Sequence, residues 1–216
     1  MFDFFKKKKK EEPAQVNAPE IMGLYINGSF QLNDLKLRLI EDKLTFANAH
    51  RNQLIQAIGE IKLDESTTLL RFYTDDDGFL QVVCKGGLTE NHIDDVKLFF
   101  FHDTQGISSQ NQWNKVLDEH VSQPTYLLEN NAFTRVWEEM GASSPPVAMT
   151  EKTYMQDGST SITDQFIMLY EREVDDNLFE FLLVSAEEKI IDNQYDRCLV
   201  ESVGINLTSS DIEIIG

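Results

Sequence analysis

The first residues that could do chemistry are an acidic run before a glycine, where Asp75, Asp76 and Asp77 precede Gly78. Carboxylates are the ligands that Ca²⁺ prefers, but a calcium loop alternates its ligands as DxDxDG and closes with a distant Glu. Three adjacent aspartates in an extended segment point in different directions. We therefore interpret this run as a solvated turn and expect no metal there.

Two further carboxylate pairs, Asp94–Asp95 and Asp175–Asp176, are neighbours in the sequence. General acid–base catalysis needs two carboxyl groups that converge across a substrate in unlike environments, and sequence neighbours do not provide this. Both pairs are typical of charged surface turns. No GxSxG, P-loop or GxGxxG motif is present either, so we identify no catalytic and no cofactor-binding residue.

Histidine and cysteine side chains are the other usual metal ligands and nucleophiles. The six in this chain are His50, His92, His102, His120, Cys84 and Cys198. They show no HxH, HExxH or CxxC spacing, and a Cys/His site would need the fold to bring His92 and His102 to Cys84. We expect scattered histidines, free thiols in a reducing compartment, and no metal.

An arginine between two aromatic residues stands in "FTRVW". Alternation along a strand would place Phe133, Arg135 and Trp137 on one face. Arg135 would then either stack on the rings in the interior, which we favour, or form with Trp137 a recognition face for a peptide or an anionic ligand.

Charge is distributed unevenly along the 216 residues, whose net charge is −18. Residues 1–12 have a net charge of +2, whereas residues 13–216 hold 14 basic and 34 acidic side chains. Nucleic-acid binding depends on basic groups that displace counterions, so nucleic acid is excluded as an expected partner. The chain has no secretory signal and no apolar run long enough to cross a bilayer, which predicts a cytoplasmic protein.

The opening "MFDFFKKKKK" combines apolar rings with a basic run, the two parts of a weak membrane anchor. The candidate docking residues for a membrane or a partner are Phe2, Phe4, Phe5, Lys6, Lys7, Lys8, Lys9 and Lys10. Two alternatives remain open, because the lysines could form a solvated tail without a role or fold back onto the acidic body.

Most of the remaining chain shows the period of two that is typical of half-buried strands. "DLKLRLI" would place Leu35, Leu37 and Leu39 on one face of a strand. "LLRFYTDDDGFLQVVC" and "TYLLENNAFTRVW" indicate two hairpins, and "VAMTEKTY", "FIMLYEREV" and "LFEFLLVSAEEKII" indicate further antiparallel strands. "DKLTFANAHRNQLIQAIGEI" fits either a short helix or a strand.

One helix is expected over residues 109–121, where apolar residues recur at i, i+3, i+4 and i+8 after a serine and before Pro124. The predicted fold class is α+β, mainly antiparallel β-sheet with few helices, with two packed subdomains as one arrangement. Residues 1–20 would be a disordered basic-aromatic segment and linker. Residues 21–216 would be the globular β-rich domain, with the subdomain boundary near residues 141–147.

Long phrases such as "SQPTYLLENNAFTRVWEEMGASSPPVAMTE" and "DGSTSITDQFIMLYEREVDD" resemble the YjfK-type family of uncharacterised bacterial proteins. The resemblance extends from about Ile21 to the end. It implies a neighbourhood of phage-shock-protein-A-like and small membrane proteins, and it supplies no catalytic residue.

We therefore expect a non-enzymatic, cytosolic protein-interaction module that acts near the inner membrane surface in a phage-shock-like stress context. Its partners would be phage-shock-protein-A-like or small membrane proteins, with peripheral contact to an anionic membrane. The alternative is an enzyme with an active site outside known motifs, for which a deep pocket with convergent polar groups would be the distinguishing observation.

Overall fold

Twelve antiparallel strands form one sheet in the computed structural model, which describes residues 17–137 and 144–215. Their order along the sheet is not their order along the chain. The strands are β1 (Ser29–Leu32), β2 (Asn52–Lys62), β3 (Thr67–Thr74), β4 (Gly78–Lys85), β5 (Ile93–Gly106), β6 (Thr125–Leu128), β7 (Asn131–Arg135), β8 (Val147–Met155), β9 (Thr160–Asp175), β10 (Leu178–Ile191), β11 (Gln194–Asn206) and β12 (Ile212–Ile215).

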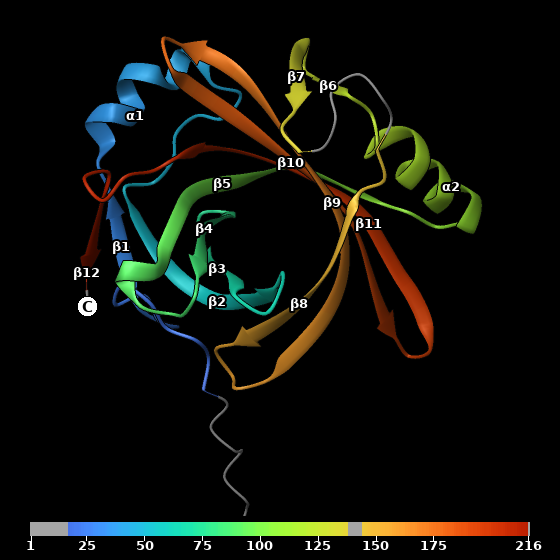
Figure 1. The fold of residues 1–216 in the computed structure, drawn as a ribbon, viewed down its shortest axis with the longest axis horizontal. Helices are drawn as coiled ribbons and strands as arrows, with labels where there is room; N and C mark the ends of the chain where they lie inside the picture. The colour runs from blue at the N-terminus through green and yellow to red at the C-terminus, as the bar shows by residue number, and fades with distance from the viewer. Residues whose placement is uncertain (1–16, 138–143, 216) are drawn as a thin grey trace, which may run out of the picture.

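Eight of these strands close into a ring, and Figure 1 looks into it. Pairing runs in the order β2, β3, β4, β5, β11, β10, β9, β8 and back to β2. Successive side chains on each strand point alternately into and out of the ring. A closed sheet of eight strands has an interior that side chains fill or that holds one small ligand.

Two strands of the ring are shared with branches of the sheet. The first half of β2 pairs with β1, which pairs with β12, whereas the second half of β2 pairs with β8. In the same way, β9 pairs with β8 through its first half and with β7, the partner of β6, beyond it. The ring therefore closes only where β8 bridges β2 and β9.

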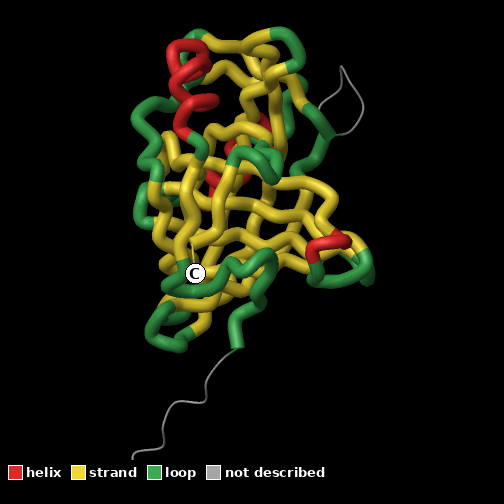
Figure 2. Tube along the Cα trace, turned by 90° about the vertical axis from the view of Figure 1, so that its left-hand side faces the viewer, coloured by secondary structure: helices red, strands yellow, loops and turns green. Residues whose placement is uncertain are grey.

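The helical segments lie outside the ring, with α1 and α2 on different sides of it in Figure 1. They are α1 (Asp34–Ile40), α2 (Gln110–Lys115), the 3₁₀ turns η1 (Glu41–Lys43) and η2 (Glu90–His92), and the π-turn η3 (Val116–His120). In the side view of Figure 2, strands make up most of the molecule. None of the helices in the described ranges is long and apolar enough to span a membrane.

Three apolar clusters form the core. The first lies on the outer face of β2–β5 under the N-terminal segment and includes Phe30 and Phe72. The second lies on the outer face of β9–β11 under α2 and includes Trp113 and Tyr170. The third fills part of the ring interior and includes Phe99.

The predicted fold class is confirmed as mostly antiparallel β-sheet with few helices. Both predicted hairpins are present as β3–β4 and β6–β7, and the three C-terminal strand segments are β8, β9 and β10. The segment predicted as a helix over residues 109–121 forms α2 and η3, and the Ser109 hydroxyl caps it by accepting from Gln112 N at 3.2 Å.

The strand predicted for "DLKLRLI" was wrong, because this segment is helix α1. The Asn33 side chain caps the helix by accepting from the backbone N–H of Leu35 at 3.3 Å. Leu37 and Ile40, three residues apart, face the core, while Leu39 is exposed. Leucine, lysine and arginine also have high helix propensity, which here prevails over the alternating pattern.

The stretch left open between helix and strand contains the end of the 3₁₀ turn η1, a loop and then most of β2. The predicted disordered segment falls mostly on residues 1–16, outside the described residues. The predicted subdomain boundary near residues 141–147 also lies partly outside them, and it stays a prediction.

Candidate functional site

A layer of polar side chains crosses the inside of the ring and is centred on Arg71 of β3. Its neighbours Leu70 and Phe72 point outward into the first core cluster, so alternation turns Arg71 inward, where it is buried. Its Nη1 donates to Glu151 Oε2 of β8 at 3.0 Å and to Gln165 Oε1 of β9 at 2.8 Å. Its Nε donates to Gln81 Oε1 of β4 at 3.2 Å.

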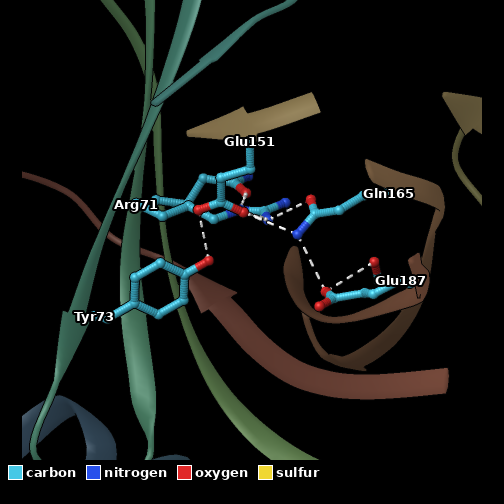
Figure 3. A network of polar contacts seen from close by, with 7 residues as sticks. Arg71, Tyr73, Glu151, Gln165 and Glu187 are labelled. Atoms are coloured by element: carbon cyan, nitrogen blue, oxygen red, sulfur yellow. Dashed lines mark hydrogen bonds and ion pairs between the residues drawn. The ribbon is translucent and has the colours of Figure 1, made fainter. Parts of the chain in front are cut away.

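The layer continues from Glu151 to β10, as Figure 3 shows. The Gln165 amide donates to Glu151 Oε2 at 2.8 Å and to Glu187 Oε1 at 3.1 Å. The Tyr73 hydroxyl donates to Glu151 Oε1 at 2.7 Å, and the Ser185 hydroxyl donates to Glu187 Oε1 at 3.1 Å. Five strands of the ring, β3, β4, β8, β9 and β10, thus present polar groups to one another.

Burial sets the electrostatics of this layer. It raises the pKa of Glu187, which the nearby Glu151 carboxylate raises further while Arg71 opposes the shift. It also raises the pKa of the Tyr73 hydroxyl well above its usual value. Among the described residues, Arg71 Nη2 is buried without a hydrogen-bond acceptor. The layer therefore holds one donor nitrogen that its own acceptors do not satisfy.

Gly59 of β2 makes room for the layer. A Cβ atom at this position would lie 1.6 Å from Glu151 Oε1, far inside any allowed contact. Gly59 pairs with Arg71 on one side and with Thr153 of β8 on the other. The absent side chain lets the Glu151 carboxylate lie against the β2 backbone and meet Arg71.

Two cavities adjoin the layer. Leu69 and Met149 line the larger, with a volume of about 860 Å³, and Tyr73 and Thr153 line the smaller, of about 440 Å³. Arg71 lies between the two lining residues of β3, and Glu151 lies between those of β8. The polar layer is therefore the floor that separates the two cavities.

The larger cavity has an apolar wall and a charged rim. Apolar side chains of five strands and of the segments after β2 and β7 form the wall, namely Leu63, Leu69, Val83, Val136, Trp137, Val147, Ala148, Met149, Ile167, Leu169, Phe181 and Leu183. Charged side chains at the ends of β2 and β4 and near the start of β5 also line it, namely Lys62, Lys85, Asp94, Asp95 and Lys97. Its volume and composition are those of small-molecule sites, which enclose about 300–1,000 Å³.

Polar residues make up a larger share of the lining of the smaller cavity, and they include Thr163, Glu187 and Cys198. Burial and the nearby carboxylates of Glu187 and Asp196 raise the pKa of the Cys198 thiol to about 11. A reactive cysteine has a lowered pKa, so Cys198 is not an activated nucleophile at neutral pH. Neither Cys198 nor the buried Cys84 forms a disulfide.

The acidic residues singled out in the sequence have structural partners. Asp75 accepts from Leu54 N at 2.9 Å, and Asp76 accepts from His50 N and Gln53 Nε2, each at 2.8 Å. Asp94 pairs with Lys85 at 2.8 Å. These contacts fix the β3–β4 turn against the start of β2 and place Asp94 at the rim of the larger cavity.

The remaining carboxylates and histidines are also distributed over several places. Asp175 pairs with Lys43 at 2.5 Å, and His102 lies 3.5 Å from Glu129. His92 contacts the Thr89 hydroxyl at 2.6 Å. No three His, Cys, Asp or Glu side chains gather as a metal-ligand set within residues 17–137 and 144–215.

Phe133 and Arg135 lie on the buried face of β7, and Trp137 follows the strand. Phe133 and Arg135 are buried, and Arg135 Nη1 donates to Ser122 O at 3.2 Å. Trp137 is half-buried and lines the larger cavity. Of the two predicted recognition residues, Trp137 is the one that lines the larger cavity. The recognition face itself stays a prediction.

The docking residues predicted in the first ten positions all lie outside the described residues. The sequence reasoning did not identify Arg71, Glu151, Gln165 or Glu187. Their signal was weak, because each is a polar residue at an inward position, and only Arg71 has apolar residues on both sides in the sequence. Only the pairing of β3, β2, β8, β9 and β10 shows that these positions meet.

Comparison with known proteins gives a family without an assigned reaction. The chain is 30% identical over 212 residues to the protein YjfK of Escherichia coli strain K12, described as uncharacterised, covering 96% of this chain and 95% of the relative. No solved structure matches it. The family of proteins of unknown function DUF2491 matches residues 1–213, and the chain belongs to this family.

Proposed function

We propose that the protein binds one small, largely apolar molecule in the larger cavity of the ring. The observation that carries this proposal is a space of about 860 Å³ with an apolar wall, a polar floor and a charged rim. Apolar surface removed from water contributes about 25 cal/mol per Å², which makes such a wall a favourable environment for an apolar ligand.

Binding is better supported than catalysis. The polar groups that converge in the ring bond to one another, and Gln165 stands between Glu151 and Glu187. General acid–base catalysis needs carboxyl groups directed at a substrate, and nucleophilic catalysis needs a lowered pKa. Tyr73 and Cys198 both have raised pKa values. We therefore interpret the polar layer as a structural floor of the cavity and not as a set of catalytic groups.

A role as a protein-interaction module near the inner membrane surface is a second, separate proposal. Its support is the basic and apolar composition of the first ten residues and the acidic remainder of the chain. The two proposals are compatible, because the candidate docking segment and the cavity involve different residues.

Two methionines on β8 provide a matched test of the cavity proposal. Met149 lines the larger cavity, and Met155, on the same strand beyond the polar layer, lines the smaller one. We expect the uncharged dye Nile red to bind the wild-type protein with one-to-one stoichiometry and enhanced fluorescence. Met149→Trp, which fills part of the larger cavity, should abolish this binding, whereas Met155→Trp should retain it.

Circular dichroism melting of both variants confirms that each is folded before titration. Absence of dye binding to the folded wild-type protein would contradict the proposal. Equal loss of dye binding in the two variants, or dye binding that is retained by Met149→Trp, would also contradict the proposal, because the dye would then bind outside the larger cavity.

A further inference from the structure

The rim of the larger cavity holds three lysines and two aspartates. Lys62 ends β2, Lys85 ends β4, and Lys97 lies within β5. Asp94 and Asp95 are the two acids of the rim. These five side chains have a net charge of +1 in a protein whose net charge is −18, and Lys62 also lies 3.9 Å from Glu60 Oε1 of β2.

Lys97 differs from the other two lysines in its burial. Its side chain is 10% exposed, whereas those of Lys62 and Lys85 are 74% and 59% exposed. The Lys97 ammonium lies 4.7 Å from the centre of the Phe181 ring and 2.5 Å from Asp95 Oδ2. It is therefore held at the boundary between the apolar wall and the charged rim.

A lysine ammonium has three N–H donors. Among the described residues, Asp95 Oδ2 is the hydrogen-bond acceptor of Lys97, and the Phe181 ring interacts with its charge. Asp95 thus accepts from one of the three donors, which leaves two N–H groups for solvent or for a ligand. An anionic oxygen would accept from them in a charge-assisted hydrogen bond, which is stronger than a hydrogen bond between neutral groups.

The interior of the cavity favours an apolar part of a ligand, whereas the rim favours an anionic group. Its wall includes side chains such as Val83, Ile167 and Leu183, and the polar groups at its floor bond to one another, with Arg71 Nη2 as the exception. Gln81 is an example, since its Oε1 accepts from Arg71. A ligand that fits both regions has an apolar chain for the wall and an anionic group for the rim.

We propose that the larger cavity takes a single-chain amphiphile whose anionic head is a carboxylate or a phosphate. The alkyl chain lies along the apolar wall, and the head accepts hydrogen bonds from Lys97, with Lys85 and Lys62 providing further positive charge. This inference rests on the proposed function, because it assigns a ligand class to the same cavity.

Displacement of bound Nile red tests the ligand class. The competitors share one dodecyl chain and differ in their heads: dodecanoate, dodecyl phosphate, dodecanol and dodecyltrimethylammonium, all kept below their micelle-forming concentrations. We expect the two anions to displace the dye at concentrations about tenfold lower than dodecanol, since a charge-assisted hydrogen bond contributes a factor of this order. The cationic amphiphile should be the weakest competitor.

Lys97→Met retains much of the apolar stem and removes the ammonium group. It should weaken displacement by the anions about tenfold and leave displacement by dodecanol unchanged. Lys85→Met, at an exposed position, should weaken the anions less and is the second variant if Lys97→Met does not fold. Lys189→Met is the control, since it removes the same charge from the far end of β10.

The outcomes separate this inference from the proposed function. If Nile red binds in the larger cavity but dodecanol and the anions compete equally, the assigned ligand class is wrong and the cavity proposal stands. The same follows if Lys97→Met and Lys189→Met have equal effects on the anions. A preference between dodecanoate and dodecyl phosphate identifies the head group, and either order supports the inference.

Discussion

The Glu187 carboxyl lies in the polar layer, and its pKa is raised by the fold. It accepts from Gln165 Nε2 and from the Ser185 hydroxyl, each at 3.1 Å. Burial, with the like charge of Glu151, raises its pKa above the ordinary value of 4.5, while Arg71 acts in the opposite direction. The folded protein therefore holds the Glu187 proton more tightly than the unfolded chain does.

This shift predicts a pH-dependent effect of Glu187→Gln. The stabilisation due to the tighter proton is fully present below pH 4.5 and is lost as the pH rises through the folded-state pKa. Glutamine keeps the acceptor and cannot ionise. The variant should therefore be more stable than the wild type near pH 8 and equally stable near pH 4, as measured by urea unfolding.

Glu65→Gln, in the exposed turn between β2 and β3, controls for the change in net charge. A gain in stability for Glu187→Gln that is larger near pH 4 than near pH 8 would show that the sign of the shift is wrong.

At the scale of the elements, β8 closes the ring by lying against Gly59 of β2. Gly59→Ala would place a Cβ atom 1.6 Å from Glu151 Oε1 and would force the carboxylate away from Arg71. Disruption of a buried ion pair costs about 3–5 kcal/mol. We expect a loss of this size in the free energy of unfolding, measured with urea.

Gly106→Ala on β5 is the matched control, because a Cβ atom there would meet nothing within 4 Å. It should change stability by less than about 1 kcal/mol. Similar stabilities of the two variants would contradict the tight approach of β8 to β2.

The hairpins were predictable because their signals are local. Acidic residues and Gly78 mark the β3–β4 turn, and Glu129 and Asn130 adopt positive φ angles of 47° and 71° in the β6–β7 turn. Helix α1 was not predictable in this way. The alternating leucines of "DLKLRLI" satisfy the strand period and conceal the helical spacing of Leu37 and Ile40. A pattern of seven residues is too short to separate the two periods.

The polar layer could not be predicted for a different reason. Arg71 and Glu151 are 80 residues apart in the chain, and Arg71 and Gln165 are 94 apart. Nothing in one strand specifies which distant strand will face it. The cavities follow from the same pairing, so the sequence predicted the antiparallel fold class but not the site.

At the scale of the whole molecule, the basic start and the acidic remainder predict a salt-sensitive interaction with anionic membranes. Lysines near an anionic leaflet contribute about 1 kcal/mol each. Ala18 packs against the first core cluster, so residues 11–16 are the available spacer, and six residues can extend about 20 Å, beyond the Debye length of about 8 Å. The acidic body can therefore stay clear of the surface.

Flotation with anionic vesicles measures this interaction. We expect weak binding of the full chain that decreases with added salt and is lost when Lys6, Lys7, Lys8, Lys9 and Lys10 are replaced by Gln. Neutral vesicles are the control. Equal flotation of the wild-type and glutamine proteins would remove the proposed role of the lysine run.

The bridging position of β8 also determines how fast the ring can assemble. Strands β2–β5 and β9–β11 each form consecutive hairpins from neighbouring segments, and such local pairs form within about 1–10 μs. The contacts of β8 with β2, and of β5 with β11, join segments that are distant in the chain. Their loop-closure entropy must be overcome before packing compensates for it, which places folding of this chain in the millisecond-to-second regime of proteins with mostly non-local contacts.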